Sequence, residues 1–397
     1  ENRKRALERI NVGELKKRLR KIKEFSIDNL ESLKEMCIKN LEEQGVVVYQ
    51  AKNAREAIKI FRKIVPPKTV VVKSKSNVIH ELELVEQLER RNKFIETDCG
   101  DFIVQICDEN PSHPVTPALH ITVERVVEVI RKMFKAKIQP KPEEISKWVR
   151  DYLRKRIIEA KVGLTGANVI SADGGIFILE NEGNISLVSR IPEKHVVITG
   201  IDKIVSNVEE GVLICKALSI WGSGTSMPSY INIIGSPSKT ADVQKKLVYG
   251  MHGAKEVHLI LVDNGRSKMI ESGFGELLYC INCGACMYSC PVYRQILHHY
   301  GYHYFGGVGI GKTFFNHSVK LAFERGLYYC TTCKACEKVC PLSIPIPDII
   351  RKLRELAVNS GFETEVNRRM MENVNAVGNP FGEEIVEGKV PKELYCC

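Results

Sequence analysis

Eight of the fourteen cysteines fall in two runs of identical spacing towards the C-terminal end of the sequence. The first run is Cys280, Cys283, Cys286 and Cys290, and the second is Cys330, Cys333, Cys336 and Cys340. Gaps of two, two and three residues separate the cysteines of each run, and a proline follows the last one. This spacing is typical of bacterial [4Fe-4S] motifs. Because two such runs in one chain make coincidence negligible, the sequence predicts two [4Fe-4S] clusters.

The spacing also predicts which thiolates share a cluster. Three cysteines within seven residues can surround three iron corners, whereas the fourth, followed by proline, turns away and reaches the other cluster. We therefore expect a first cluster site of Cys280, Cys283, Cys286 and Cys340, and a second cluster site of Cys330, Cys333, Cys336 and Cys290. Zinc is the alternative, but structural zinc usually joins two separated Cys-x2-Cys knuckles. The forty-position step from Cys290 to Cys330 favours an α-helical ferredoxin module over a minimal ferredoxin.

Such clusters change charge by one electron, and nearby charges set their potentials. Lys334 and Lys338 lie within the second run, whereas no charged residue lies between Cys280 and Cys290. We therefore expect the second cluster to have the higher potential.

A phosphate-loop pattern occurs between the two runs, because Gly306 to Thr313 reads G-x4-G-K-T. A phosphate loop leaves a buried apolar strand and enters a helix of an α/β domain. Here His303-Tyr304-Phe305 precedes the pattern, and the second run begins at Cys330. We therefore expect no nucleotide binding.

Weaker signals lie in the first two thirds of the chain. The residues after the apolar run 231–234 are expected to open a helix, whose free N–H groups either are simply capped or bind a carboxylate or phosphate. The residues concerned are Ser236, Ser238, Lys239 and Thr240. Glu180 and Glu182 are candidate carboxylates of a ligand site. His113 and His120 could form a polar pocket near Glu96-Thr97-Asp98, although a structural role is the more common one for loop histidines.

The remaining cysteines carry no metal-ligand spacing. Cys37, Cys99, Cys107 and Cys215 are isolated and are expected to be buried small apolar residues. Cys396 and Cys397 end an expected tail and suggest no role.

Composition describes a globular protein of two domains. The chain has 397 residues, of which 44% are hydrophobic and 27% charged, and no apolar run approaches the 18 to 20 residues of a membrane span. The polar N-terminus lacks the apolar stretch of a secretory signal, so we expect a cytoplasmic protein. Ten basic residues against four acidic ones in residues 1–24 supply much of the net charge of +10, but without interleaved aromatics they do not indicate nucleic-acid binding. They suit a solvated face or a face that docks an acidic partner or a membrane surface.

Apolar periodicity predicts helices alternating with strands, which indicates an α/β layer architecture. Turn residues at Asp173-Gly174 and Glu182-Gly183-Asn184 separate strand-like runs. A mixed sheet is expected, and the first domain is expected to end at about residue 270. Expected strands are 46–49, 69–72, 102–106, 195–199, 231–234 and 257–262, and expected helices include 82–90, 123–134, 143–160, 319–326 and 348–357.

With these motifs the sequence resembles the LUD-domain (lactate utilisation) iron-sulfur proteins. The resemblance covers about residues 30–350. Besides the regions 280–294 and 330–348, the matching stretches are Lys73 to Ser76, Glu96 to Asp98, Pro111 to His113, Gly163 to Ala167, Glu180 to Asn184, Ser236 to Asp242 and Asp263 to Arg266.

The resemblance implies an α/β LUD domain folded like the NagB/RpiA/CoA-transferase group, followed by an α-helical ferredoxin domain with two [4Fe-4S] clusters. We expect an N-terminal helical segment at 1–65, the LUD domain at 66–270, the ferredoxin domain at 271–358 and a C-terminal extension at 359–397. The family's usual partners are a CCG-type cysteine-rich subunit and a small LUD-domain subunit. The tail resembles the lead-in to a CCG region, and Lys312-Thr313 departs from the family's usual apolar stretch.

The expected function is that of a non-catalytic electron-transfer subunit in a complex that oxidises lactate to pyruvate. No flavin motif is visible, so a partner such as a flavin-bearing oxidase subunit would do the hydride chemistry, and the acceptor could be a quinone, a ferredoxin or a thiol-disulfide centre. Membrane association would come through partners. One alternative is the same relay serving another substrate or a heterodisulfide or quinone reductase. The other is an LUD domain that binds or transforms a small acid or CoA-type ligand.

Overall fold

A computed structural model describes residues 2–112 and 116–392 of the chain. Its centre is a six-stranded sheet in which every neighbouring pair of strands is parallel. In spatial order the strands are β1 (Val47–Ala51), β12 (Glu256–Val262), β7 (Lys194–Gly200), β4 (Val162–Thr165), β2 (Val70–Lys73) and β3 (Lys93–Glu96). The carboxyl ends of all six strands therefore share one edge, which is where open α/β sheets bind ligands.

Alternation along the strands gives this sheet two apolar faces. On β7, Val196 and Ile198 pack with helices α4 (Ala54–Ile64), α5 (Asn77–Glu81) and α6 (Leu84–Leu88). Val197 points the other way, towards helix α3 (Leu30–Glu43). Beyond β3, helices α7 (Cys99–Cys107), α8 (Val123–Phe134) and α9 (Pro142–Glu159) form a third buried cluster.

A second sheet lies beyond α3 and joins the first domain to the helical one. Its strands, in spatial order, are β8 (Ile204–Val205), β5 (Val169–Ser171), β6 (Gly175–Glu180) and β9 (Tyr230–Ile234). Helices α10 (Asn184–Arg190) and α11 (Val208–Leu218) follow β6 and β8. The expected turn at Asp173-Gly174 is confirmed, since Gly174 has a φ of 101° between the antiparallel strands β5 and β6.

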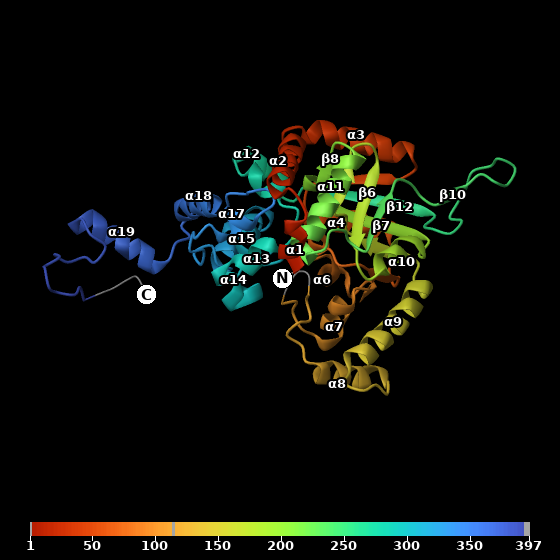
Figure 1. The fold of residues 1–397 in the computed structure, drawn as a ribbon, viewed down its shortest axis with the longest axis horizontal. Coiled ribbons are helices and arrows are strands. Elements are labelled where there is room, and N and C mark those ends of the chain that lie inside the picture. Colours follow the sequence, from red (N-terminus) through yellow and green to blue (C-terminus); the bar gives the residue numbers. More distant parts are fainter. Residues whose placement is uncertain (1, 113–115, 393–397) are drawn as a thin grey trace.

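From residue 275 onwards the named elements are all helices. The elements are η3 (Gly275–Tyr279), α13 (Ala285–Ser289), α14 (Pro291–Ile296), η4 (Leu297–His299), α15 (Gly306–Asn316), α16 (Val319–Glu324), α17 (Ala335–Val339), α18 (Ile346–Asn359) and α19 (Glu365–Val377). They form the part of Figure 1 drawn in teal and blue, and α19 extends away from the body with no buried residue. The phosphate-loop pattern lies inside α15, with no strand before it, so the expectation of a false match agrees with the fold.

The helical part is not a separate lobe with a core of its own. Leu277 and Ile350 from this part share one buried apolar cluster with Phe177 of β6 and Trp221 of the helical turn η2 (Ser219–Ser223). Helices α1 (Asn2–Glu8) and α2 (Val12–Asp28) pack against η2 and η3, respectively, and α12 (Arg266–Glu271) links β12 to η3. No described helix is both long and apolar enough to span a membrane.

Two expected elements are wrong. Residues 102–106 are part of helix α7 rather than a strand, because the Asp98 side chain accepts hydrogen bonds from the N–H groups of Gly100 and Asp101 and caps the helix. The helix expected after residue 234 is absent, and the segment forms a two-stranded hairpin of β10 (Lys239–Thr240) and β11 (Val248–Tyr249) that projects from the body in Figure 1.

The sheet also bears on the expected domain boundary at residue 66. Strand β1 and helix α4 precede that position, yet β1 pairs with β12 along its full length. Part of the expected N-terminal segment is therefore an edge of the central sheet.

Candidate iron-sulfur site

The two cysteine runs adopt the same local backbone. Asn282 and Gly284 of the first run have φ values of 59° and 75°, and the equivalent Thr332 and Lys334 have values of 55° and 62°. Each loop then enters a short helix, α13 or α17, and these two helices pack together. Because left-handed residues reverse the chain direction tightly, three cysteines of each run can face one point.

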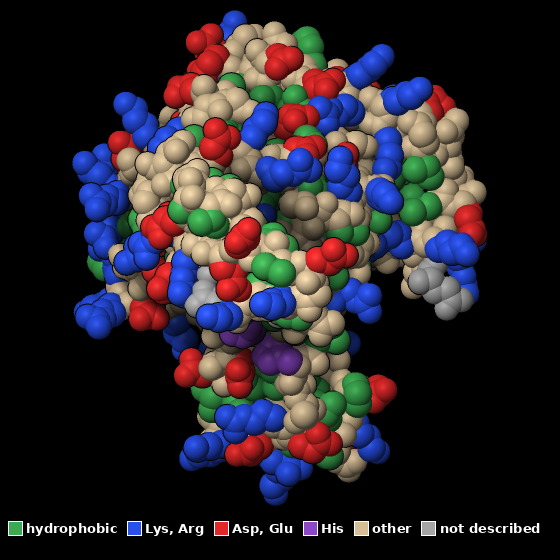
Figure 2. Space-filling view, turned by 90° about the vertical axis from the view of Figure 1, so that its left-hand side faces the viewer, with side chains coloured by type: hydrophobic (Ala, Val, Ile, Leu, Met, Phe, Trp, Pro, Cys, Tyr) green, Lys and Arg blue, Asp and Glu red, His purple; other side chains and the backbone are tan. Residues whose placement is uncertain are grey.

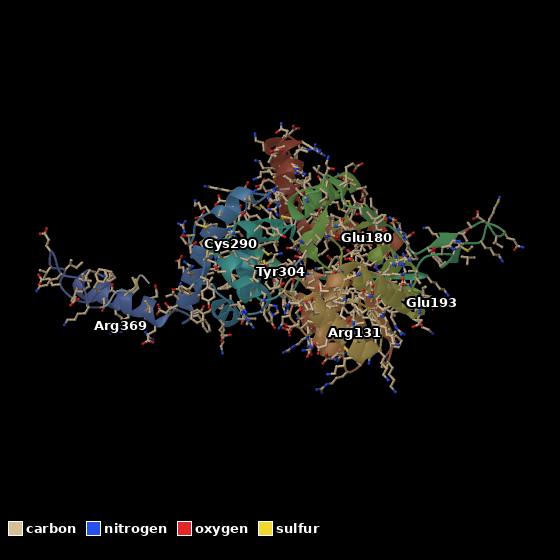
Figure 3. All side chains as sticks on the ribbon, turned by 60° about the horizontal axis from the view of Figure 1, so that its bottom comes forward. Arg131, Glu180, Glu193, Cys290, Tyr304 and Arg369 are labelled. Carbon is tan, nitrogen blue, oxygen red and sulfur yellow. The ribbon has the colours of Figure 1, made fainter. Side chains whose placement is uncertain are left out.

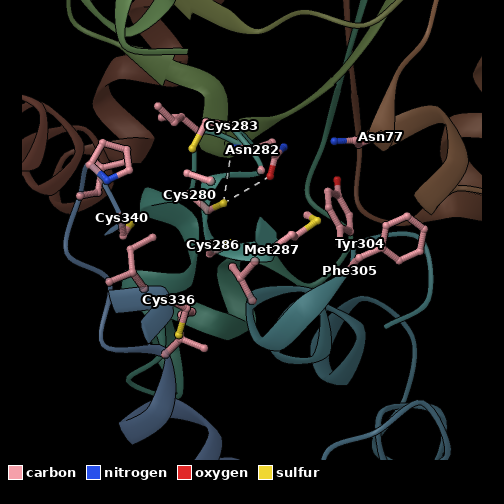
Figure 4. Close-up of a pocket in the computed structure, with 18 of the residues that line it drawn as sticks. Asn77, Cys280, Asn282, Cys283, Cys286, Met287, Tyr304, Phe305, Cys336 and Cys340 are labelled. Atoms are coloured by element: carbon pink, nitrogen blue, oxygen red, sulfur yellow. Dashed lines mark hydrogen bonds between the residues drawn. The ribbon is translucent and has the colours of Figure 1, made fainter. Parts of the chain in front are cut away.

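The cysteines line two neighbouring cavities. Figure 4 shows the first cavity, lined by Cys280, Cys283, Cys286, Cys336 and Cys340. The second is lined by Cys286, Cys290, Cys330, Cys333 and Cys336. The structure thus brings Cys340 beside the first three cysteines of the first run, and Cys290 beside those of the second run. Cys286 and Cys336 lie between the two cavities.

The thiols differ in their readiness to ionise. Burial, with smaller contributions from Cys280 and Cys340, raises the pKa of the Cys283 thiol to about 12. Burial likewise raises the pKa of Cys336 to about 12. The pKa of Cys333 is lowered instead, chiefly by the N–H of Ala335 at the start of α17. Because metals bind thiolates, loading iron must release protons from these buried thiols.

The donor set fits iron-sulfur clusters. Five cysteines line each cavity, two of them shared, and Met287 and Asn282 are among the few other side chains with a sulfur, oxygen or nitrogen atom in the first lining. Within the described residues, no three His, Cys, Asp or Glu side chains are arranged to hold a single metal ion. Instead, the thiols line cavities, as the ligands of a cluster with several iron atoms do.

Buried lysines surround the first cluster site. The ammonium group of Lys312 donates to Asn282 Oδ1 at 3.1 Å, and the N–H of Asn282 approaches Cys280 Sγ at 3.4 Å. Lys203 donates to the carbonyl oxygen of Cys280 at 3.1 Å. The ammonium of Lys312 also lies 4.4 Å from the centre of the Tyr304 ring. The cluster site therefore carries positive charge that the first cysteine run does not itself supply.

These lysines belong to a charged network at the carboxyl edge of the central sheet. Arg266, just after β12, donates to both carboxylate oxygens of Glu81 at 2.8 Å and also bonds Asp202, just after β7. Tyr304 donates to Glu81 at 2.7 Å. Burial opposes ionisation of Glu81, but Arg266 outweighs it and lowers the pKa of this carboxyl. Figure 3 places Tyr304 where the helical part meets the α/β domain.

The two candidate carboxylates have different surroundings. Glu180 is buried and caps α10, accepting from the N–H groups of Ile185 at 2.6 Å and Ser186 at 3.0 Å, and from Asn232 at 2.8 Å. Its oxygens are occupied by structural bonds. Glu182 is exposed and accepts from the N–H of Cys99 at 3.1 Å.

Glu182 lies in a groove of about 1130 Å³ between α9, α10 and β9. Arg150, Arg154 and Arg190 are also in its lining. Desolvation in the groove and the charge of Asp98 raise the pKa of Glu182 to about 7. The part of the groove that contains Glu182 lies beside a second charged cluster at the carboxyl edge of the central sheet.

In that cluster Lys73 and Glu96 form a buried ion pair across the paired ends of β2 and β3. Lys75 lies 3.7 Å from Asp101. Among the described residues, Glu96 Oε2 and Asp101 Oδ2 are buried without a hydrogen-bond partner. Burial first, and then the charge of Asp101, raise the pKa of Glu96 to about 7 although Lys73 opposes this.

Other predicted residues do not converge on a site. Thr240 donates to Asp242 at 2.6 Å within the exposed hairpin, and Ser236 donates to a neighbouring carbonyl. Because no helix begins here, Ser236, Ser238, Lys239 and Thr240 have no helical N–H groups beside them to form the expected anion site. His120 lies 4.0 Å from Glu109, while His113, Cys396 and Cys397 are outside the described residues. Cys37, Cys107 and Cys215 are buried as expected, and Cys99 is partly exposed.

Charged side chains of both signs cover the side of the molecule seen in Figure 2. Lys and Arg side chains alternate there with Asp and Glu, and the histidines gather in a hollow below the centre. Such mixed charge does not form the continuous basic stripe that phosphate backbones require.

Sequence reasoning missed the lysine and arginine network. Lys203 and Arg266 each follow a strand-like apolar run, which signals the carboxyl edge of a parallel sheet. Lys23 and Lys312 have no such signal, because helical periodicity does not show that a cluster site lies beside them.

Comparisons with known proteins identify both regions. A family model described as the LUD domain matches residues 34–262, and one described as a 4Fe-4S dicluster domain matches residues 276–344. The chain is similar to "Lactate utilization protein B" of Bacillus velezensis, with 33% identity over 364 residues, which are 90% of this chain and 75% of that protein. The protein of the same name from Lysinibacillus sphaericus is 34% identical over 371 residues, 90% of this chain and 74% of that protein.

A solved structure of a DUF162-family protein from Deinococcus radiodurans also matches, with 13% identity and a TM-score of 0.32. The match covers 59% of this chain and 98% of that one.

Proposed function

This chain belongs to the LUD-domain family and carries a 4Fe-4S dicluster domain, and from that premise we propose that it is the electron-transfer subunit of a lactate-oxidising complex. The observation that carries the proposal is the grouping of eight cysteines around two adjoining cavities. When bound there, two [4Fe-4S] clusters would each accept and release one electron. The chain's own residues would hold the clusters close together and keep water from the first of them.

The crossed assignment is part of this proposal. Cys340 would complete the first cluster site and Cys290 the second, so that each cluster is tied to both cysteine runs. Support comes from the lining of the first cavity, which contains Cys340 but not Cys290, and from the lining of the second, which contains Cys290 but not Cys340.

The names of the relatives support lactate as the substrate of the complex. We propose that partner subunits supply the remaining parts: a CCG-type cysteine-rich subunit, a small LUD-domain subunit and a donor such as a flavin-bearing oxidase. The oxidation of lactate to pyruvate releases two electrons, which two one-electron centres can take up in turn.

The proposal is tested on protein purified without air. We expect about eight irons and eight sulfides per chain, and EPR signals of reduced [4Fe-4S] clusters after dithionite treatment. Lactate alone should leave the clusters oxidised, whereas lactate with the copurifying subunits should reduce them. Zinc in place of iron, or far fewer than eight irons per chain, would contradict the proposal. Reduction by lactate alone would show that the chain is itself the dehydrogenase.

A second candidate function is ligand binding by the LUD domain, and the groove at Glu182 favours it. Arginines in the lining could hold an anionic group, while Glu182 lies towards the sheet edge. The volume of about 1130 Å³ exceeds that needed for lactate and suits a larger ligand, such as a CoA ester.

Calorimetry with acetyl-CoA, lactate and pyruvate distinguishes these ligands. We expect saturable binding of acetyl-CoA that Arg154→Gln weakens at least tenfold, because an arginine of the lining would hold an anionic group. Arg18→Gln is the matched control, because Arg18 is also exposed but lies outside the groove. Equal binding to both variants would exclude the groove.

A further inference from the structure

Buried cations outnumber buried anions beside the first cluster site. Lys23, Lys203, Lys312 and Arg266 are each at most 7% exposed, and the carboxylates among them are those of Glu81 and Asp202. Burial and the charge of Lys203 lower the pKa of Lys23 to about 7, so this lysine carries less than a full charge at neutral pH. The other three cations still exceed the two carboxylates by one.

Two of these cations approach the same cysteine, Cys280. Lys203 binds the carbonyl of Cys280, and Lys312 reaches the same residue through Asn282. Lys312 is 2% exposed, so water screens its charge from the first cluster site very little. Two further cations, Arg3 and Lys16, act from the N-terminal helices on Cys283 and Cys340.

The second cluster site has weaker charges around it. Lys334 and Lys338, on which the expected order of potentials depended, are exposed, and Glu337 lies between them in the chain. Arg354 donates to the carbonyl of Cys330 at 2.6 Å, but its side chain is partly exposed. Water screens exposed charges much more than buried ones, so these cations stabilise added negative charge less.

We propose that the LUD domain acts as the counter-charge of the first cluster, with Lys203 and Lys312 as positioning residues that give this cluster the higher potential. The inference rests on the proposed function and reverses the order expected from sequence. Reduction adds one negative charge to a cluster, and a buried ammonium nearby stabilises that charge. The cluster at the carboxyl edge of the LUD sheet would therefore be reduced first.

The test is an EPR-monitored redox titration of the full chain with both clusters loaded. Lys312→Met keeps most of the length of the side chain and removes its charge. We expect the midpoint potential of the higher-potential cluster to fall while the other changes little, and Lys312→Arg to restore most of the loss. The matched control is Lys338→Met, an exposed lysine near the second site, which should shift either potential less.

Iron content separates this inference from the proposed function. If Lys312→Met retains the wild-type iron and sulfide but both potentials are unchanged, the inference is wrong and the proposed function stands. A larger shift in the lower-potential cluster would also overturn it. Lys203→Met provides a second test through a different contact with Cys280, and should lower the same potential even if Lys312→Met fails to accumulate as folded protein.

Discussion

In the proposed assignment the last cysteine of each run ties the two clusters together, since Cys290 and Cys340 each lie beside the other run. We predict that Cys340→Ser depletes the first cluster site, because the neutral hydroxyl is a poor iron ligand, and lowers the iron content from about eight to about four per chain. The EPR signal that remains should be that of the second cluster.

Cys215→Ser is the matched control for this substitution. Cys215 is a buried cysteine of α11 that lines neither cluster cavity, so its loss should leave the iron content unchanged. If Cys340→Ser instead removes the signal of the second cluster, the crossed assignment is wrong.

A buried histidine gives a prediction about pH. His195 of β7 shares a hydrogen bond of 2.8 Å with Thr165, and burial lowers its pKa to about 3, against about 6.5 in an unfolded chain. Between these values the unfolded state binds the extra proton, so stability falls as pH falls below about 6.5. We predict that the urea midpoint drops less between pH 7.5 and 5.5 in His195→Gln than in the wild type. An equal drop in both proteins would contradict this assignment.

At the scale of elements, packing explains the glycines of the phosphate-loop pattern. A Cβ at Gly309 would lie 2.1 Å from the carbonyl oxygen of Tyr304, and one at Gly311 would lie 2.7 Å from Leu277. Helix α15 therefore needs glycine at these two positions to approach its neighbours, and packing accounts for them.

We predict that Gly309→Ala destabilises the protein by about 1 to 3 kcal/mol, because a backbone oxygen cannot move aside as a side chain can. This is opposite to the usual gain of about 1 kcal/mol when alanine replaces glycine inside a helix. Gly13→Ala in α2 is the control, since a Cβ there meets only Asn11 Oδ1 at 3.7 Å. Thermal unfolding of both variants checks the prediction, which fails if the two melting temperatures shift alike.

The elements that sequence predicted well are those whose pattern leaves one interpretation. Helix α8 coincides with the expected 123–134, and β12 with the expected 257–262. The run 102–106 is short and apolar, and such runs suit a strand or a buried helix equally. The cap at Asp98 decided between them, and it depends on backbone geometry that composition does not reveal.

For the whole molecule, the sequence predicts the cysteine groups of the proposed clusters but not the residues that surround them. Iron ligation needs fixed spacing within a short loop, so Cys280 and its partners are visible in the chain. The network of Glu81, Asp202, Arg266 and Lys312 joins four distant segments, and no local pattern links them. Their proximity follows from the parallel sheet, which brings the ends of β7 and β12 beside the ferredoxin domain.

Glu81 lies at the centre of that network. Its carboxylate is almost fully buried and accepts hydrogen bonds from Arg266, Asn264 and Tyr304. We predict that Glu81→Gln costs on the order of 3 kcal/mol, since removing one partner of a buried ion pair leaves the other charge uncompensated. Glu83→Gln is the matched control two residues away. Glu83 bonds Tyr302 at 2.7 Å but is partly exposed, so its loss should cost about 1 kcal/mol or less.

Urea unfolding and limited proteolysis of the cluster-loaded protein compare the two variants. We expect Glu81→Gln to unfold at a lower urea concentration and to be cut faster in the linker between β12 and η3. The reason is that the charged network holds the ferredoxin domain against the sheet. Equal unfolding midpoints and equal cleavage rates in both variants would mean that the shared apolar core of Leu277, Ile350 and Trp221 fixes the two domains without the charged network.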